Sequence, residues 1–99
     1  MIKINQFYST KKDLVMIRHS SMVHGKCPVN GRWDYYQVDV ETKEFLEVSE
    51  LEEVLDFVRG TSKTQEEIAK NISMTLPYKC KITVVGRHSQ NTETVVICD

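Results

Sequence analysis

No apolar stretch of this 99-residue chain approaches the roughly 20 residues that a membrane-spanning helix needs. The N-terminal run MIKINQFYST has no signal-peptide pattern either. We therefore expect a cytoplasmic protein that does not engage a membrane.

A strong charge of either sign is also missing, because the formal net charge is −1. A stand-alone nucleic-acid binder normally depends on a basic surface that neutralises phosphates. The composition argues against that class, although it leaves room for a local basic patch or for a pocket that takes a nucleobase.

The sequence lacks the even set of cysteines that is typical of a disulfide framework. Its three cysteines are Cys27, Cys80 and Cys98, and an odd number in a reducing compartment argues against such a framework. Each one is therefore a core residue, a ligand or a nucleophile. Cys80 and Cys98 fall within strand patterns, and we predict that both are core residues.

The chain shows no internal repeat, linker or low-complexity segment, and its length suits one domain covering residues 1–99. A core of that size is thin. Oligomerisation that buries further surface would be a natural supplement.

Alternating and continuous apolar runs predict four strands. The first two are separated by a loop at residues 23–33, where Pro28 and the pair Asn30-Gly31 signal turns. A polar loop at residues 86–91 separates the last two, and the polar residues 1–12 are expected to form an arm. The predicted strands cover about residues 14–21, 35–40, 80–85 and 94–98.

Two helices are predicted between the second and third strands, after a short extended piece at residues 45–47. Gly60 is expected to end the first helix and Pro77 the second. The predicted capping boxes are Ser49 with Glu52 and Ser62 with Gln65. The predicted buried faces consist of Leu51, Val54, Leu55, Val58, Ile68, Ile72 and Leu76.

The order strand, strand, helix, helix, strand, strand predicts an α+β domain, with a four-stranded, mostly antiparallel sheet and two helices on one face. Such a sheet has open edges. A ring of subunits that joins these edges into a barrel would remove them.

The loop around Cys27 carries the strongest chemical signal. Lys26 favours the thiolate, which is the reactive form of cysteine. Pro28 restricts the backbone, and Asp34 lies seven residues after the cysteine, at the start of the next predicted strand. A thiolate and a neighbouring carboxyl group suit attack on an electrophilic carbon, with the carboxyl group transferring the proton. The alternative is a small buried cysteine beside a turn, and the residues alone leave both interpretations open.

The segment CPVNGRWD at residues 27–34 resembles the C-P-x-T-G-Q-P-D segment of the 7-cyano-7-deazaguanine reductase family. That family has the tunnelling fold, whose element order matches the order predicted above. The resemblance implies that Cys27 attacks the nitrile carbon to form a covalent thioimide and that Asp34 handles the proton. Asn30, Arg32 and Trp33 depart from the family's Thr, Gln and Pro.

The resemblance also suggests a substrate pocket. The family's E-S-K-S-x-K-x-Y run corresponds to residues 47–54, and its F-R-N-H arginine corresponds to Arg59. The glutamate of F-H-E corresponds to Glu66, which is implied to bind the guanine-like edge of the base. Glu67 is a rival for that role, and a solvated helix residue is the plain alternative. The implied substrate-binding residues are Leu46, Glu47, Val48, Gln65 and Glu66, with Gln65 in place of the family's histidine.

Both lysines of the family run are absent, since Ser49 and Glu52 occupy their positions. In the reductases these lysines help to hold the cofactor phosphates, whereas Glu50 and Glu53 would repel them. We therefore expect no cofactor. The chain is most similar to the short archaeal-type relatives, which add ammonia to the nitrile and give an amidine, as in archaeosine of transfer RNA.

The partners implied by this resemblance are 7-cyano-7-deazaguanine, as a free base or within a nucleic acid, and ammonia or an ammonia donor. Transfer RNA is preferred over DNA as the carrier of the base. The family also implies a homo-oligomer, a pentamer or a decamer. The alternatives are NADPH-dependent reduction of the nitrile to the aminomethyl base and a non-catalytic module that binds the deazaguanine.

Pterin-forming proteins of the same fold bind zinc through three histidines, including a closely spaced pair. This chain has His19, His24 and His88 but no H-x-H pair, so we expect no metal site. The three are interpreted as surface or loop residues. His88 is also a candidate for a small basic patch with Arg87 and Lys81.

Overall fold

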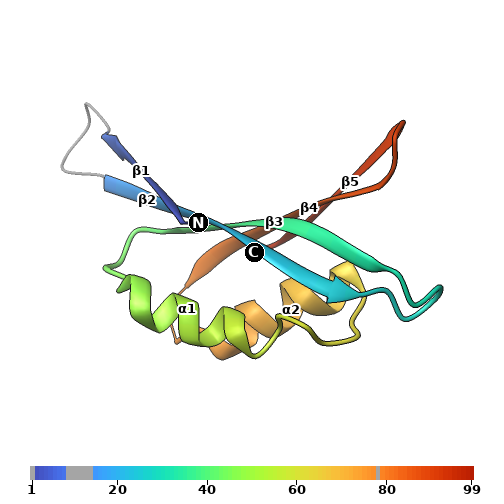
Figure 1. The fold of residues 1–99 in the computed structure, drawn as a ribbon. Helices are drawn as coiled ribbons and strands as arrows, with labels where there is room; N and C mark the ends of the chain where they lie inside the picture. The colour runs from blue at the N-terminus through green and yellow to red at the C-terminus, as the bar shows by residue number, and fades with distance from the viewer. Residues whose placement is uncertain (1, 9–14, 78) are drawn as a thin grey trace.

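The computed structural model describes residues 2–8, 15–77 and 79–99, which form an antiparallel sheet with both helices on one face (Figure 1). In this part of the chain the sheet has five strands, in the order β1-β2-β3-β4-β5. The elements are β1 (Lys3–Tyr8), β2 (Val15–Lys26), β3 (Trp33–Thr42), α1 (Val48–Asp56), α2 (Gln65–Thr75), β4 (Cys80–Ser89) and β5 (Thr92–Cys98). The predicted α+β class, with two helices on one face of an antiparallel sheet, is confirmed.

The predicted number of strands was wrong, because residues 3–8 form the edge strand β1 and not an arm. This strand pairs with β2 from Lys3↔Ser20 to Tyr8↔Val15. An edge strand needs a backbone ladder on one side only, so it can form without the apolar alternation of a central strand. Of the other residues of the predicted arm, Ile2 precedes β1, whereas Met1 and residues 9–12, like Leu14, lie outside the described residues.

The strands β2 and β4 are longer than predicted. The β2–β3 ladder continues to Lys26↔Trp33, so the loop between them is confined to residues 27–32. Gly86, which was predicted to begin a loop, pairs with Tyr36 inside β4. Backbone pairing extended both strands beyond their apolar residues, because ladder hydrogen bonds do not require apolar side chains.

Both predicted helix starts were wrong. The first helix, α1, begins at Val48 after the N-cap Glu47, which makes no side-chain capping bond. The capping box of α2 is formed by Thr64 and Glu67, where the Glu67 amide donates to Thr64 Oγ1 at 3.2 Å and the Thr64 amide to Glu67 Oε1 at 3.1 Å. The predicted motif is therefore present, but it lies two residues further along the chain.

The first helix also ends earlier than predicted, at Asp56. The chain then makes a turn over residues 57–60 that ends at Gly60, whose φ of 76° favours glycine.

The seven predicted helix core residues are all buried, which confirms that part of the sequence analysis. They pack against Val23, Val38, Val40, Ile82 and Val84 of the sheet. Cys80 and Cys98 are half-buried against this core, as predicted. Burial raises the pKa of the Cys80 thiol, and the neighbouring Cys98 adds to this shift, so the protonated form of Cys80 is favoured.

Arg59, in the turn after α1, ties this helix to β2. Its Nη2 donates to Ser21 Oγ at 2.9 Å and to the Met22 carbonyl oxygen at 3.2 Å, while its guanidinium also pairs with Glu52 and Asp56. The hydrogen bond from Arg59 lowers the pKa of Glu52. This network holds the end of α1 against the part of β2 that leads to Cys27.

No helix within the described ranges is long and apolar enough to cross a membrane.

Replacing Arg59 with alanine is expected to lower the free energy of unfolding by about 1–2 kcal/mol, because hydrogen bonds to two polar groups of β2 are lost. The pKa of Glu52 is lowered in the folded state, so its contribution is present above the unfolded pKa and is lost as the pH falls through the folded pKa. The difference between wild type and Arg59→Ala should therefore shrink in acid. Urea denaturation at several pH values measures this, with the exposed Arg87→Ala as the control; equal stability of wild type and Arg59→Ala would contradict the assignment.

Candidate active site

Cys27 and Asp34 lie at the same end of the sheet. Asp34 pairs with Gly25, which is buried on the helix-bearing face, and Cys27 follows Gly25 by two residues. Both Cys27 and Asp34 are half-buried. The β-hairpin thus brings together the two residues that were predicted to be catalytic.

The loop that carries Cys27 is closed by its own backbone. The Cys27 amide donates to the Arg32 carbonyl oxygen at 2.8 Å, and the Gly31 amide donates to the Cys27 carbonyl oxygen at 2.8 Å. Gly31 has a φ of 73°, which favours glycine at this turn. These bonds hold the cysteine at the start of a defined turn.

The segment between the helices anchors the same end of β2. The Lys26 amide donates to the Thr61 carbonyl oxygen at 2.9 Å, and the Gly60 amide donates to the His24 carbonyl oxygen at 2.9 Å. A Cβ atom on Gly25 would lie 3.2 Å from the Thr61 carbonyl oxygen, so the two backbones are in close contact. The chain that leads into α2 is therefore fixed beside the cysteine loop.

Tyr36 lies at the centre of this region, although the sequence analysis assigned it only to a strand. Its side chain is 3% exposed, and its hydroxyl donates to Asp34 Oδ2 at 3.3 Å. Burial is the main factor that raises the pKa of Tyr36 to about 12, and the charges of Asp34, Cys27 and Glu66 add to it. Three predicted site residues therefore lie near one hydroxyl group, which remains protonated and donates a hydrogen bond.

Gln65 is the first residue of α2 and is 4% exposed. Its Nε2 donates to the carbonyl oxygens of Val84 and Thr94, each at 2.8 Å, and its Oε1 lies 2.9 Å from His88 Nε2. These contacts attach the N-terminus of α2 to β4 and β5. They also occupy most of the hydrogen-bonding capacity of Gln65, so its contact with a substrate stays a prediction. Glu66, which follows it, is exposed.

Gly86 is required because the Tyr36 ring lies directly against its backbone. A Cβ atom at this position would be 2.6 Å and 2.7 Å from two ring carbons of Tyr36, and 3.1 Å from Gln65 Oε1. A glycine within an alternating strand indicates such an approach of another group. That signal was present in the sequence but was interpreted as the start of a loop.

Leu46, Glu47 and Val48 lie elsewhere, around a hollow of about 330 Å³ beside β1 and the start of α1. Ile4, Ile17 and His19 also line it. Within one chain the structure therefore separates these three residues from Gln65 and Glu66.

His19 was interpreted as a surface or loop residue, and this was wrong. It lies in β2, its side chain is 3% exposed, and neither ring nitrogen has a hydrogen-bond partner among the described residues. Burial lowers its pKa. The neutral imidazole is therefore favoured at this position.

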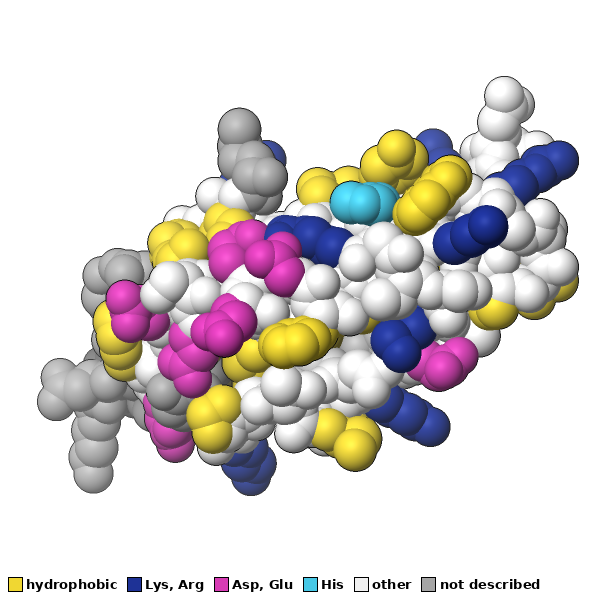
Figure 2. All heavy atoms as spheres, turned by 60° about the horizontal axis from the view of Figure 1, so that its bottom comes forward, with side chains coloured by type: hydrophobic (Ala, Val, Ile, Leu, Met, Phe, Trp, Pro, Cys, Tyr) yellow, Lys and Arg dark blue, Asp and Glu magenta, His cyan; other side chains and the backbone are white. Residues whose placement is uncertain are grey.

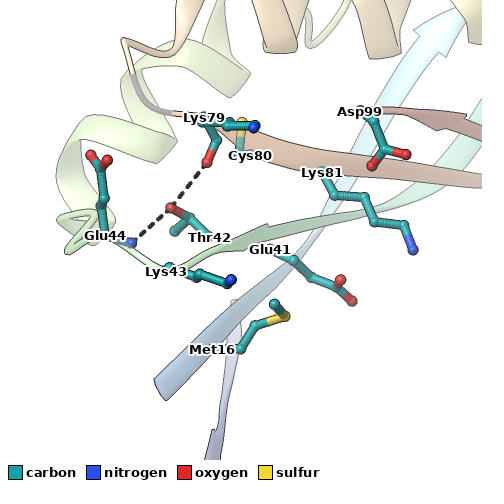
Figure 3. Close-up of a pocket in the computed structure, with 9 residues that line it drawn as sticks. All are labelled: Met16, Glu41, Thr42, Lys43, Glu44, Lys79, Cys80, Lys81 and Asp99. Atoms are coloured by element: carbon teal, nitrogen blue, oxygen red, sulfur yellow. Dashed lines mark hydrogen bonds between the residues drawn. The ribbon is translucent and has the colours of Figure 1, made fainter. Parts of the chain in front are cut away.

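A second hollow, of about 440 Å³, contains no predicted site residue (Figure 3). It lies where β3 ends and β4 begins. There Thr42 Oγ1 accepts a hydrogen bond from the Glu44 amide at 3.1 Å and donates to the Lys79 carbonyl oxygen at 3.5 Å. Its lining consists of Met16, Glu41, Thr42, Lys43, Glu44, Lys79, Cys80, Lys81 and Asp99.

The histidines are not gathered at one place. His24 faces the side of the sheet away from the helices, beside Trp33 and Tyr35 with ring centroids 5.7 Å and 6.2 Å away. His88 contacts Gln65 on the helix-bearing side. Among the residues that the structure describes, no group of three or more His, Cys, Asp or Glu side chains could hold a metal ion.

Charge is unevenly distributed over the surface that Figure 2 shows. Acidic side chains gather on the side where α1 begins, and several Lys and Arg side chains lie toward the side of the β2–β3 loop. The exposed Lys26 and Arg32 flank the Cys27 loop. Helix α1 carries Glu50 in its first turn and has no basic residue in its last turn.

Comparison with known proteins gives a likeness in structure but none in sequence. No model of a protein family matches the sequence, and no curated protein matches it. The fold is similar to that of a protein described as the archaeosine synthase QueF-Like in the apo form, with a TM-score of 0.71 and 22% sequence identity. The alignment covers 84% of this chain and 90% of that chain. At this identity the likeness shows that the two chains share a fold.

Replacing Gly86 with alanine is expected to destabilise the protein by roughly 1–3 kcal/mol, because the new methyl group overlaps the Tyr36 ring. The cost should nearly vanish when Tyr36→Ala removes the ring, so the two substitutions should not be additive. A double-mutant cycle based on urea denaturation measures this coupling. Additive losses would show that the ring does not require the glycine.

Proposed function

We propose that this chain is an enzyme that modifies the nitrile group of a 7-cyano-7-deazaguanine base through a thioimide on Cys27. The observation that supports this most is the arrangement of Cys27, Asp34 and Glu66 near the Tyr36 hydroxyl. The shared fold adds support, because the similar protein is described as an archaeosine synthase, which is an activity related to the one proposed.

The chemistry proceeds in two steps. In the first, the Cys27 thiolate attacks the nitrile carbon while Asp34 supplies a proton to the nitrile nitrogen, and a thioimide forms. In the second, ammonia adds to the same carbon, the carbon–sulfur bond breaks, and its electron pair returns to the sulfur. The product is an amidine. Nothing is oxidised or reduced, so neither step needs a redox cofactor.

Glu66 is the proposed recognition residue for the base. It is exposed in the first turn of α2, and a carboxylate there can accept hydrogen bonds from the ring N–H and the exocyclic amine. Glu67 is less suitable, because its side chain accepts the Thr64 amide in the capping box, and this bond lowers its pKa. A switch of Glu67 to the base would leave the Thr64 amide without this acceptor.

The separation of the predicted substrate-binding residues supports a site that is shared between subunits. Leu46, Glu47 and Val48 would then complete the pocket from a neighbouring chain. The sheet edges β1 and β5 carry the exposed apolar residues Ile4, Val95 and Ile97, which are 51%, 51% and 56% exposed. Pairing of β5 with β1 of the next subunit would cover them and close a ring, proposed to be a pentamer or a decamer.

Amidination is preferred over NADPH-dependent reduction because of the charge on α1. Glu50 and Glu53, with Glu52 at a position where the reductases have lysine, disfavour a phosphate-bearing cofactor.

The nitrile base itself is proposed to be carried by transfer RNA. The exposed Lys26 and Arg32 beside Cys27 suit a phosphate backbone.

Mixing the protein with 7-cyano-7-deazaguanine, both as the free base and within transfer RNA, should give a covalent adduct at Cys27 that intact-mass analysis detects. Cys27→Ala should abolish it, because the attacking sulfur is lost. Cys80→Ala and Cys98→Ala are matched controls and should leave the adduct unchanged, since both residues pack against the core. An adduct that persists in Cys27→Ala would overturn the assignment, and the absence of any adduct in the wild type would favour a binding module.

Asp34→Asn should keep the fold and reduce turnover by about 100- to 10,000-fold, which is the usual contribution of a positioned proton-transfer group. Asp39→Asn is the matched control, because Asp39 lies in the same strand and bonds to Gln37 on the exposed side. Steady-state formation of the amidine is the measurement. Turnover at the wild-type rate in Asp34→Asn would reduce Asp34 to a structural residue.

A further inference from the structure

The hydrogen bonds of Gln65 determine which nitrogen of His88 carries a proton. Both Gln65 Nε2 contacts are to carbonyl oxygens, which only accept, so the amide orientation is fixed by the backbone of β4 and β5. Gln65 Oε1 then faces His88 Nε2 at 2.9 Å and can only accept. Nε2 of His88 therefore carries the hydrogen, and Nδ1 is the basic nitrogen of the neutral ring.

The position of His88 in β4 brings it next to Tyr36. The β3–β4 ladder ends at Tyr36↔Gly86, and His88 lies two residues beyond Gly86, at a register shift between Arg87 and Ser89. The rings of Tyr36 and His88 have centroids 6.3 Å apart and are tilted by 58°. The Tyr36 hydroxyl bonds to Asp34, so Tyr36 connects His88 of β4 with the proposed proton donor on β3.

His88 is also accessible to a ligand. It is exposed, whereas Tyr36 and Gln65, the two side chains that it contacts, are buried. The buried pair fixes the ring on one side and leaves the other side open.

The proposed reaction needs proton transfer twice. Asp34 supplies the proton that the nitrile nitrogen takes when the thioimide forms. When ammonia adds to the thioimide carbon, the new carbon–nitrogen bond leaves a positive charge on the incoming nitrogen, and this nitrogen must lose a proton before sulfur leaves. A neutral imidazole is the usual side chain for that task near neutral pH.

We propose that His88 is a second proton-transfer residue of this site, and that its Nδ1 accepts a proton from ammonia as the thioimide is converted into the amidine. This inference rests on the proposed function. The carbon–sulfur bond then breaks with its electron pair on sulfur, and the imidazolium returns its proton to Cys27 or to water. Gln65 is the positioning residue, since it fixes the tautomer through Oε1.

The test separates the two steps. His88→Gln keeps an N–H group that can donate to Gln65 Oε1 but removes the basic nitrogen. In this variant the thioimide should form within about twofold of the wild-type rate, and its release by ammonium salts should slow by about 100-fold or more. His24→Gln is the matched control, because His24 lies on the other face of the sheet, and it should release the adduct normally.

The rates come from intact-mass analysis during a single turnover: first without ammonium, then after its addition. Added imidazole should restore release in His88→Gly, which a purely structural role would not allow. Release at the wild-type rate in His88→Gln, or an equal slowing of both steps, would overturn the role of His88 alone. A wild-type protein that forms no adduct would overturn the proposed function as well.

Discussion

The buried amide of Gln65 is the contact on which the arrangement of this site depends. It is bonded to the backbone of both β4 and β5 and to His88, and it is the first residue of α2. One side chain therefore attaches the start of α2 to the sheet and faces His88, whose tautomer it is proposed to fix. A buried amide with all these partners is stable, whereas one without them would be costly.

The residues proposed to act in catalysis lie toward one end of the central strands. On the helix-bearing face, Gly25 of β2 pairs with Asp34 of β3, and Tyr36 of β3 pairs with Gly86 of β4. Two of these positions are glycines, because the Thr61 backbone and the Tyr36 ring occupy the space of a side chain. Apolar side chains are therefore missing from this end of the sheet, and polar groups occupy the space. Functional sites often depart from regular packing in this way.

The shared fold and the proposed activity are supported by different observations. The likeness to an archaeosine synthase covers most of both chains, and at 22% identity it establishes the architecture. The activity is argued from Cys27, Asp34 and Glu66 and from the absence of phosphate-binding lysines on α1. The open edges β1 and β5, together with a substrate set divided between two regions of the chain, agree with a site that a second subunit completes.

Local patterns in the sequence were sufficient for the order of the main elements, for the seven buried helix residues and for the turn between the strands that carry Cys27 and Asp34. These features depend on residues close together in the chain, and periodicity or spacing reports them directly. The tertiary structure decided the edge strand β1 and the contacts of Tyr36, Gly86 and His88. Each of those depends on distant segments: β1 needs the free edge of β2, and His88 meets an amide 23 residues away. Hydrophobic periodicity does not report such contacts, because they form only when the sheet brings the segments together.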